Sequence, residues 1–420
     1  MDNRIRMIAT FTAAVVLAGC GGGGDPEGGP PSGKSPSGQA SAAPSAAFAD
    51  PPTRFDTGRP VTIPAELRPY QYQTLYGSVP VAISDRVAVT TTRRGELAGT
   101  DITTGRQAWK VAPSRKLLGG TGSTQPVVTT LQGRRTVLAA FLTEVPGQGT
   151  TPAGVAIELI GVDVSSGGRV LDDVLPVPRD SGYEYGGGGP VGIVGVDATT
   201  AVMTWAQNTT MVADLATHKV RWTRYGFDPV GLDGGVVAER TGDGPEYRMV
   251  GLRAADQRQV WASDEIGGVF VDIAAAGPGL FSLNVKTGSA GDWGTTDLHE
   301  VRTGKPRKHV KMENSWHCRF DEAQTVLCYR GEYDGGVVGL DATSLETLWR
   351  LPSEGRIAPK VTAFWHGAVY GETSNGPVVL DARSGKDREV EPGAAPLAVS
   401  GYGGLDVLDG GAWTVYPPAR

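Results

Sequence analysis

The chain has 420 residues, of which 61 are glycine and 29 are proline, and only 20% are charged. This composition argues against a mainly helical protein and favours many short strands joined by turns. The formal net charge of −6 gives no electrostatic basis for binding nucleic acid, which is not expected as a partner.

The first residues have the form of an export signal. Arg4 and Arg6 precede an apolar run over residues 7–18, which is too short to span a bilayer as a helix. The tetrad LAGC at residues 17–20 ends that run and resembles the lipobox of bacterial lipoproteins. This resemblance implies cleavage before Cys20 and acylation of Cys20 by chains such as palmitate. A plain signal peptide with an incidental cysteine is the alternative.

Residues 21–50 are nearly all Gly, Pro, Ser and Ala, a composition that cannot bury a core. We therefore expect three parts: a signal peptide over residues 1–19, lipidated Cys20 with a flexible tether over residues 20–50, and a folded domain over residues 51–420. Such a protein would be lipid-anchored on the extracytoplasmic side of the cell membrane.

From residue 96 onward one pattern recurs: a strand, an anchor residue that is usually Asp, a tight turn, and a second strand. In ELAGTDITTGRQAW the anchor is Asp101, Gly105 closes the turn and Trp109 follows eight residues after the anchor. Asp accepts backbone N–H groups in such turns, and Gly supplies a positive φ. A Trp at a fixed place indicates packing between adjacent repeats. Further anchors are Asp163, Asp214, Arg253, Glu300, Asp341 and Asp381, with equivalent tryptophans at Trp222, Trp261 and Trp349.

Several successive anchors lie about 40 residues apart, the period of a four-stranded propeller blade. Two further strand-like runs precede each anchor, so a blade contains strands A, B, C and D with the anchored turn between C and D. The last three strand-like runs lack a fourth strand, and YQYQTLYG at residues 70–77 is the candidate that could complete them. We therefore predict an all-β, eight-bladed propeller whose last blade is closed by an N-terminal strand, with seven blades as the alternative.

Two cysteines flank a hairpin turn expected near residues 321–324. A five-residue loop there would set Cys318 and Cys328 directly opposite each other. In an exported protein this arrangement favours a disulfide. Two buried free thiols are the alternative.

The segments TDITTGRQAW, LDATSLETLW and LDARSGK resemble the repeat of the PQQ-like, or quinoprotein-like, β-propeller family, over about residues 61–420. The family includes dehydrogenases, assembly scaffolds and sensor domains, so the resemblance implies the fold more than an activity. Its dehydrogenases hold a quinone against a disulfide between adjacent cysteines, beside a calcium ion. This sequence has no adjacent cysteines, and its five histidines show no metal-ligand spacing. We therefore expect no catalytic residues, no cofactor and no metal site.

The long segments between strands fall on one face of the expected disc, because B–C loops and the connections from D to the next A share a face. Aromatic residues interleaved with carboxylates in these segments form a plausible recognition surface. The alternative is that the aromatic rings pack on their own blades. The candidate binding residues are Tyr183, Glu184, Tyr185, Asp243, Tyr247, Asp292, Trp293, Tyr333 and Asp334.

These observations predict a membrane-anchored extracytoplasmic lipoprotein whose propeller is a non-catalytic binding or scaffolding module for a protein or another envelope ligand. An envelope protein-assembly factor is the first alternative. A quinone-dependent oxidoreductase is the second, and it is disfavoured by the missing pair of adjacent cysteines.

Overall fold

The computed structural model describes residues 47–69, 80–118, 125–178, 191–205, 209–242, 246–268, 270–286, 293–310, 317–330, 335–408 and 411–419. The folded unit extends over Ala46–Arg420. Cys20, the expected signal peptide and most of the expected tether lie outside the described residues, so their assignments stay predictions.

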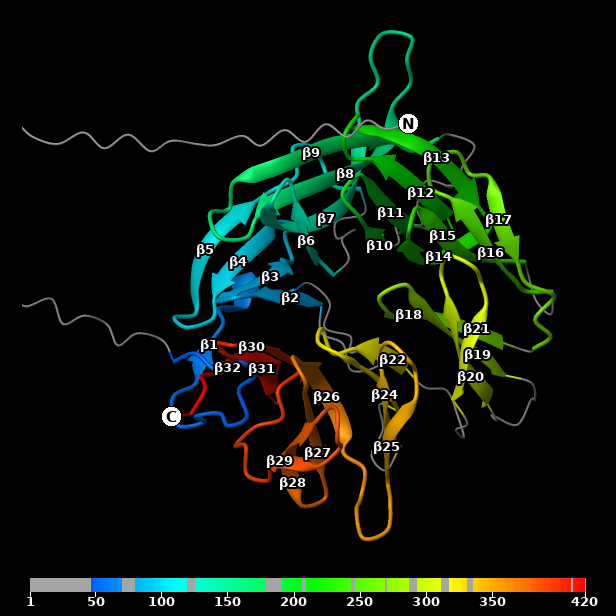
Figure 1. Cartoon of the computed structure of the whole chain (residues 1–420). Helices are drawn as coiled ribbons and strands as arrows, with labels where there is room; N and C mark the ends of the chain where they lie inside the picture. The colour runs from blue at the N-terminus through cyan, green and yellow to red at the C-terminus, as the bar shows by residue number, and fades with distance from the viewer. Residues whose placement is uncertain are drawn as a thin grey trace, which may run out of the picture. The chain divides into compact units, whose positions relative to one another are not determined.

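The folded unit consists of eight four-stranded antiparallel sheets, and the predicted eight-bladed propeller is confirmed (Figure 1). Blades one to seven each use four consecutive strands. Blade one contains β2 (Val81–Ser84), β3 (Val87–Thr91), β4 (Leu97–Asp101) and β5 (Arg106–Val111). Blade two contains β6 (Val127–Leu131), β7 (Arg134–Val145), β8 (Gly154–Asp163) and β9 (Arg169–Pro176). Blade three contains β10 (Gly192–Val196), β11 (Thr200–Trp205), β12 (Thr209–Asp214) and β13 (Lys219–Tyr225).

The next four blades repeat this order of strands. Blade four contains β14 (Phe227–Asp233), β15 (Val236–Thr241), β16 (Arg248–Arg253) and β17 (Gln259–Ala262). Blade five contains β18 (Phe270–Gly277), β19 (Leu280–Lys286), β20 (Trp293–Glu300) and β21 (Pro306–Val310). Blade six contains β22 (His317–Phe320), β23 (Thr325–Tyr329), β24 (Val337–Asp341) and β25 (Thr347–Leu351). Blade seven contains β26 (Lys360–Trp365), β27 (Ala368–Thr373), β28 (Gly376–Asp381) and β29 (Asp387–Glu389).

The eighth blade joins the two ends of the folded unit. Its strands are β30 (Ala398–Ser400), β31 (Gly403–Leu408), β32 (Ala412–Tyr416) and, on the outside, β1 (Val61–Thr62). Val61 pairs with Val415, so an N-terminal strand closes the blade as predicted. The predicted position of that strand, residues 70–77, was wrong, and those residues lie outside the described ranges. Prolines on both sides limit β1 to two residues, so it leaves no alternating pattern in the sequence.

The core is divided among the junctions between blades. Successive side chains of a strand point to opposite faces of its sheet, so each blade packs against both of its neighbours. Eight clusters of buried apolar residues occupy the eight junctions, including one that joins Ala88 and Ala98 of blade one to Leu405 and Trp413 of blade eight. The ring of blades is therefore closed by packing as well as by strand pairing.

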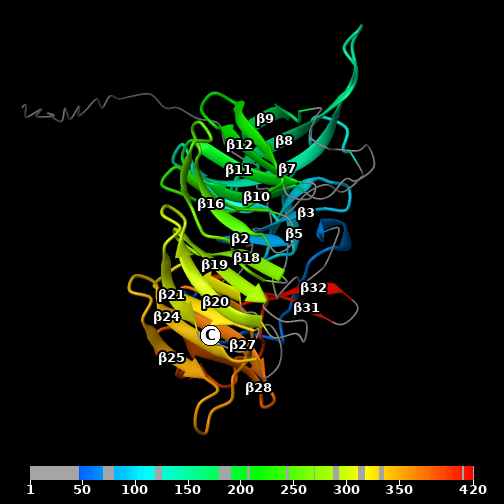
Figure 2. The same cartoon turned by 90° about the vertical axis from the view of Figure 1, so that its right-hand side faces the viewer.

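The A–B and C–D turns of each blade lie together on one face, here called the turn face. The residue after each anchor donates its N–H to a carbonyl in or next to the A–B turn, as in Ile102 to Arg86 (2.9 Å) and Ala382 to Gly367 (2.9 Å). The anchor carboxylate holds the C–D turn, since Asp101 Oδ1 accepts the N–H of Thr103 at 2.9 Å. The opposite face, with the B–C loops and the D-to-A connections, is called the loop face. The long hairpin of β7 and β8 projects beyond its blade (Figure 2).

The repeated tryptophans join adjacent blades. The indole N–H of Trp109 donates to the carbonyl of Val164 (2.8 Å), one residue after the anchor of blade two. A Cβ at Gly99 of the same blade, or at Gly167 of the next, would lie 2.3 Å from a Trp109 atom, so the ring fills the space between these two glycines. Equivalent bonds run from Trp222 to Ala254 (2.9 Å), from Trp261 to Val301 (3.0 Å) and from Trp349 to Ala382 (2.7 Å).

Residues 48–55 bind the propeller before the chain reaches β1. The Ala49 N–H donates to the carbonyl of Gly401 (2.8 Å), and the Asp50 carboxylate lies 2.6 Å from Nδ1 of His366. The Tyr370 hydroxyl donates to the carbonyl of Pro52 (2.7 Å). Residues 49 and 50, expected in the tether, therefore contact the A–B turns of blades eight and seven on the turn face.

Candidate functional site

Most of the predicted loop-face residues lie outside the described part of the chain. They are Tyr183, Glu184, Tyr185, Asp243, Asp292, Tyr333 and Asp334. Trp293 begins β20, where its backbone pairs with Lys286, and its side chain is not described. The proposed recognition role of these eight residues stays a prediction.

Tyr247 is the predicted loop-face residue whose side chain is described, and it packs on its own blade. Its backbone bridges to Ile266, and its ring lies against the apolar cluster between blades four and five. The guanidinium of Arg240 lies 5.2 Å from the ring centroid, within the range of a cation–π contact. For Tyr247 the structure therefore agrees with the alternative interpretation, in which an aromatic ring of these loops packs on its own blade.

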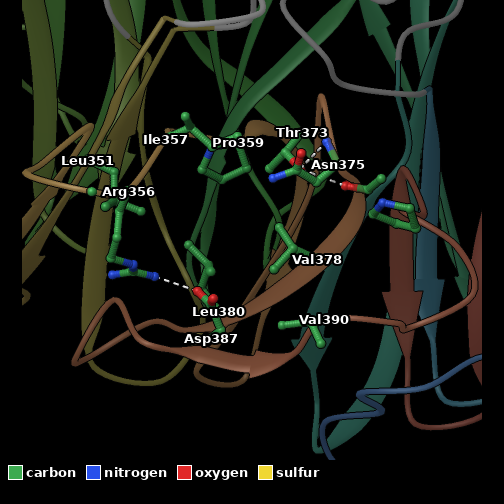
Figure 3. A pocket seen from close by; sticks show the side chains of 13 residues that line it. Leu351, Arg356, Ile357, Pro359, Thr373, Asn375, Val378, Leu380, Asp387 and Val390 are labelled. Atoms are coloured by element: carbon green, nitrogen blue, oxygen red, sulfur yellow. Dashed lines mark hydrogen bonds and ion pairs between the residues drawn. The ribbon is translucent and has the colours of Figure 1, made fainter.

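A groove with a mixed polar and apolar lining lies between blades six and seven, and Figure 3 shows the side chains that line it. Its volume is about 250 Å³. One wall is the connection from β25 to β26, and the other is the hairpin between β27 and β28 together with β29. The lining residues are Leu351, Gly355, Arg356, Ile357, Pro359, Thr373, Asn375, Gly376, Pro377, Val378, Leu380, Asp387 and Val390.

Both walls of this groove are held by local hydrogen bonds. Ser353 and Arg356 exchange backbone bonds of 3.0 and 2.9 Å, which fixes the tight turn that carries Ile357. The Thr373 hydroxyl donates to the carbonyl of Gly376 at 2.9 Å. Arg356 pairs with Asp387 across the groove (Figure 3). The groove is therefore preformed, and its charged side chains already have partners.

Two large apolar side chains are exposed at the rim of the groove. Ile357 is 45% exposed and Val390 is 62% exposed. The other large apolar side chains with this degree of exposure in the described chain are Phe48, Val260 and Leu408. Two of these five residues line one small groove, and clustered exposed apolar groups are typical of contact sites.

The loop-face end of the junction between blades three and four contains a buried acid. Glu239 is 0% exposed, and neither carboxylate oxygen has a hydrogen-bond partner. The nearby Thr210 hydroxyl donates to the carbonyl of Phe227 (3.2 Å). Burial, with a further contribution from Asp228, raises the pKa of Glu239 to about 7, against the lowering effects of the Thr210 side chain and of the Arg224 charge. This carboxyl can therefore exchange a proton near neutral pH.

Further buried or half-buried polar groups lie in blades four and six. Asp228 accepts a bond from Arg240 (3.0 Å), and burial together with Asp272 raises the pKa of Asp228. Burial lowers the pKa of His317 on blade six. In the described residues, no three His, Cys, Asp or Glu side chains are placed to hold a metal ion together. The polar groups thus do not form a recognisable metal centre in this part of the chain.

The inner A strands surround a central cavity of about 810 Å³. Aliphatic side chains from several A strands line it together with Arg135, Arg319, Glu322, Phe364 and Trp365. Its volume is within the range of about 300–1,000 Å³ that small-molecule sites occupy. The described lining shows no nucleophile with an adjacent base, so the cavity offers space without an evident catalytic arrangement.

Cys318 and Cys328 form a disulfide, with an S–S distance of 2.07 Å, in the junction between blades five and six. They lie directly opposite each other on β22 and β23, and both are fully buried. This junction lacks one of the repeated tryptophans, because Lys308 stands eight residues after the anchor Glu300.

Replacing both cysteines by alanine should lower the free energy of unfolding by about 2–3 kcal/mol, because the cross-link restricts the unfolded chain. Urea unfolding of the wild type and of the Cys318→Ala, Cys328→Ala variant measures the difference. A reducing agent should shift the wild-type midpoint toward that of the variant and leave the variant unchanged. Equal midpoints of wild type and variant under oxidising conditions would contradict this expectation.

Comparison with models of known protein families gives no match, and no curated protein matches the sequence. No helix in the described residues is long and apolar enough to cross a membrane. The resemblance to the PQQ-like family therefore stays a prediction at the level of sequence.

Solved structures with a similar fold include the C-terminal WD40 domain of Sif2 (10% identity, TM-score 0.50), which covers 80% of this chain and 94% of that domain. They also include BamB from Moraxella catarrhalis (14% identity, TM-score 0.44, covering 86% and 98%). A third is the computationally designed Ika8 protein (14% identity, TM-score 0.47, covering 80% and 95%). At these identities a similarity concerns the fold alone, so the site itself must support any functional proposal.

Sequence reasoning missed the groove and the buried acid. Ile357 stands in a connection between Pro352 and Pro359, and an aliphatic residue outside any strand pattern was the available signal. Glu239 stands in the strand VVAERT next to buried apolar positions, and that position within a core strand was the signal for it.

Proposed function

We propose that the chain is a lipid-anchored extracytoplasmic protein whose propeller is a non-catalytic binding module for a protein partner. The groove between blades six and seven is the proposed contact site. The observation that carries this proposal is the preformed groove with Ile357 and Val390 exposed at its rim. The LAGC tetrad at residues 17–20 supports the lipid anchor.

The groove suits a protein segment better than a cofactor. Its volume of about 250 Å³ is below the usual range of about 300–1,000 Å³ for small-molecule sites, but it can receive an apolar side chain. The charges of Arg356 and Asp387 compensate each other, so the groove offers no uncompensated charge for an ionic ligand. An extended segment of a partner that inserts an aliphatic or aromatic side chain is the proposed occupant.

Photo-crosslinking tests this contact. A photoreactive residue at position 357 should give a discrete product with one envelope protein in intact cells. Val260, also exposed (50%) but on the outer strand β17, is the matched control position and should give none. Products of equal intensity from positions 260 and 357 would show that capture does not depend on the groove.

Two added charges at the rim of the groove should weaken binding without unfolding the propeller. The Ile357→Asp, Val390→Asp variant should weaken partner affinity by about 30-fold to 1,000-fold, because central apolar contacts contribute about 1–2 kcal/mol each. Both side chains are exposed, so the free energy of unfolding should change by less than about 0.5 kcal/mol per substitution. Titration of the captured partner and thermal unfolding measure the two effects. A Val260→Asp control should bind like the wild type, and unchanged affinity of the double variant would overturn the proposed site.

Two further measurements test the other parts of the proposal. Metabolic labelling with palmitate should mark the wild type and not a Cys20→Ser variant, which should also leave the membrane fraction. Turnover of an alcohol or sugar by the purified chain supplied with a quinone would contradict the non-catalytic role.

A further inference from the structure

Residues 48–55, here called the strap, pack between blades seven and eight before the chain reaches β1. Phe55 is 4% exposed and belongs to the apolar cluster of this junction, where its ring centroid lies 5.9 Å from that of Tyr370. The C-terminal end of the chain holds the strap as well, because the Ala419 N–H donates to the carbonyl of Arg54 at 2.9 Å. The strap therefore has a fixed place in the folded unit.

The strap also contacts the segment that follows β29, and this segment forms part of one wall of the groove. The Phe55 N–H donates to the carbonyl of Pro392 at 2.7 Å. A Cβ at Gly393 would lie 2.6 Å from the Phe55 carbonyl oxygen, so the two backbones are in close contact. Val390, exposed at the rim of the groove, precedes these residues by only two positions.

One carboxylate links the strap to the backbone at Val390. Glu389 Oε2 lies 3.2 Å from Nε of Arg54, and Glu389 Oε1 accepts the N–H groups of Val390 and Glu391 at 3.0 Å each. The side chains of Arg54 and Glu389 are 60% and 21% exposed, so the pair has the modest strength of a surface ion pair. Arg54 is not among the residues that line the groove, and it acts on Val390 through Glu389.

The opposite wall of the groove holds the other end of the same segment. Asp387 pairs with Arg356, which lies on the connection from β25 to β26 (Figure 3). Val390 therefore lies between two attachments, one to the opposite wall and one to the strap. Together these attachments fix the position of Val390 at the rim.

We propose that the strap is a positioning element of the groove and that it acts through the pair of Arg54 with Glu389. A docked strap holds Val390 in place for an inserted aliphatic or aromatic side chain, and a released strap loosens this wall. By linkage, a partner that requires the ordered wall stabilises the docked strap by the same factor. This inference rests on the contact site proposed above and adds regulation of that site by the N-terminal segment.

Hydrogen exchange of the free, full-length chain tests the positioning without a partner. Arg54→Gln removes the charge and keeps the backbone bonds of the strap. The protection factors of the Val390 and Glu391 amides should therefore fall by about twofold to fivefold, the range of an exposed ion pair. Glu389→Ala should lower them at least as much, and Arg54→Gln should add nothing in the Glu389→Ala background.

Arg59→Gln is the matched control, because Arg59 is similarly exposed (66%) and pairs with its neighbour Asp56. It should leave both protection factors unchanged. The thermal midpoint of Arg54→Gln should equal that of the wild type. A general loss of stability would instead lower this midpoint and speed exchange throughout blade seven. Either that result or unchanged protection at Val390 and Glu391 overturns the positioning role and leaves the proposed contact site intact.

Titration of the partner captured at position 357 tests the consequence for binding. Arg54→Gln should lower the affinity by about twofold to fivefold, and Arg59→Gln should not lower it. If the Ile357→Asp, Val390→Asp variant binds like the wild type, the contact site itself is overturned. If that variant loses affinity while Arg54→Gln binds like the wild type, only the regulation by the strap is overturned.

Discussion

Replacing Trp109 by alanine should lower the free energy of unfolding by about 3–5 kcal/mol. The side chain is buried between blades one and two, and its indole N–H donates to the carbonyl of Val164. Alanine would leave a cavity and an unpaired carbonyl in that junction. Denaturant unfolding of the purified chain measures the loss, and a change below about 1 kcal/mol would show that the ring tolerates an open junction.

A second substitution tests whether the loss arises from packing against the glycines. Gly99 has an ordinary backbone conformation, but a Cβ there would lie 2.3 Å from Trp109. Gly99→Ala should therefore cost about 1–3 kcal/mol in the wild type and little or nothing in the Trp109→Ala background. Equal costs in both backgrounds would contradict direct contact between Trp109 and Gly99.

Replacing Glu239 by glutamine should stabilise the protein above pH 7 by up to about 3 kcal/mol. The pKa of Glu239 is raised from 4.5 to about 7 in the folded chain, first because of burial. The folded state therefore holds this proton more tightly than the unfolded state. The resulting stability is fully present below about pH 4.5 and is lost as the pH rises through about 7, and Glu239→Gln should remove that dependence.

Unfolding measured from pH 4 to pH 8 shows the effect, with wild type and variant converging at the acidic end. The neighbouring charged groups that oppose or reinforce this shift are Arg224 and Asp228. Asp163 and Asp214 have pKa values lowered to about 2 by hydrogen bonds in their turns, so they titrate outside this window. A Glu239→Asp control keeps the charge and should keep the pH dependence. Equal slopes for wild type and Glu239→Gln would contradict the assignment.

The architecture was predictable because seven of the eight blades repeat the same kind of strand, turn and strand. The anchored turn joins a carboxylate, a positive-φ residue and an apolar strand at fixed spacing, as at Asp101 and Gly105, and this spacing survives in most copies. The closing strand was not predictable in the same way. β1 is two residues long, and its partner Val415 is more than 350 residues away, so neither periodicity nor local turn chemistry indicates the pairing.

The candidate site was less predictable than the fold. Composition places Tyr247 in a long loop, but only tertiary packing decides that its ring lies on the core and under Arg240. The groove depends on two segments, around Ile357 and Val390, that meet only when blades six and seven are side by side. Sequence indicates which loops are long. It does not indicate which exposed side chains the folded ring brings together.

The attachment of residues 48–55 also has a mechanical consequence. A pulling force applied to the chain before Phe48 reaches the contacts with Gly401, His366 and Tyr370 before it reaches the short strand β1. These contacts must break before tension acts on the pairing of Val61 with Val415. In a protein held by its N-terminus, residues 48–55 would carry the tension first. The ring of blades would stay closed until these residues detached.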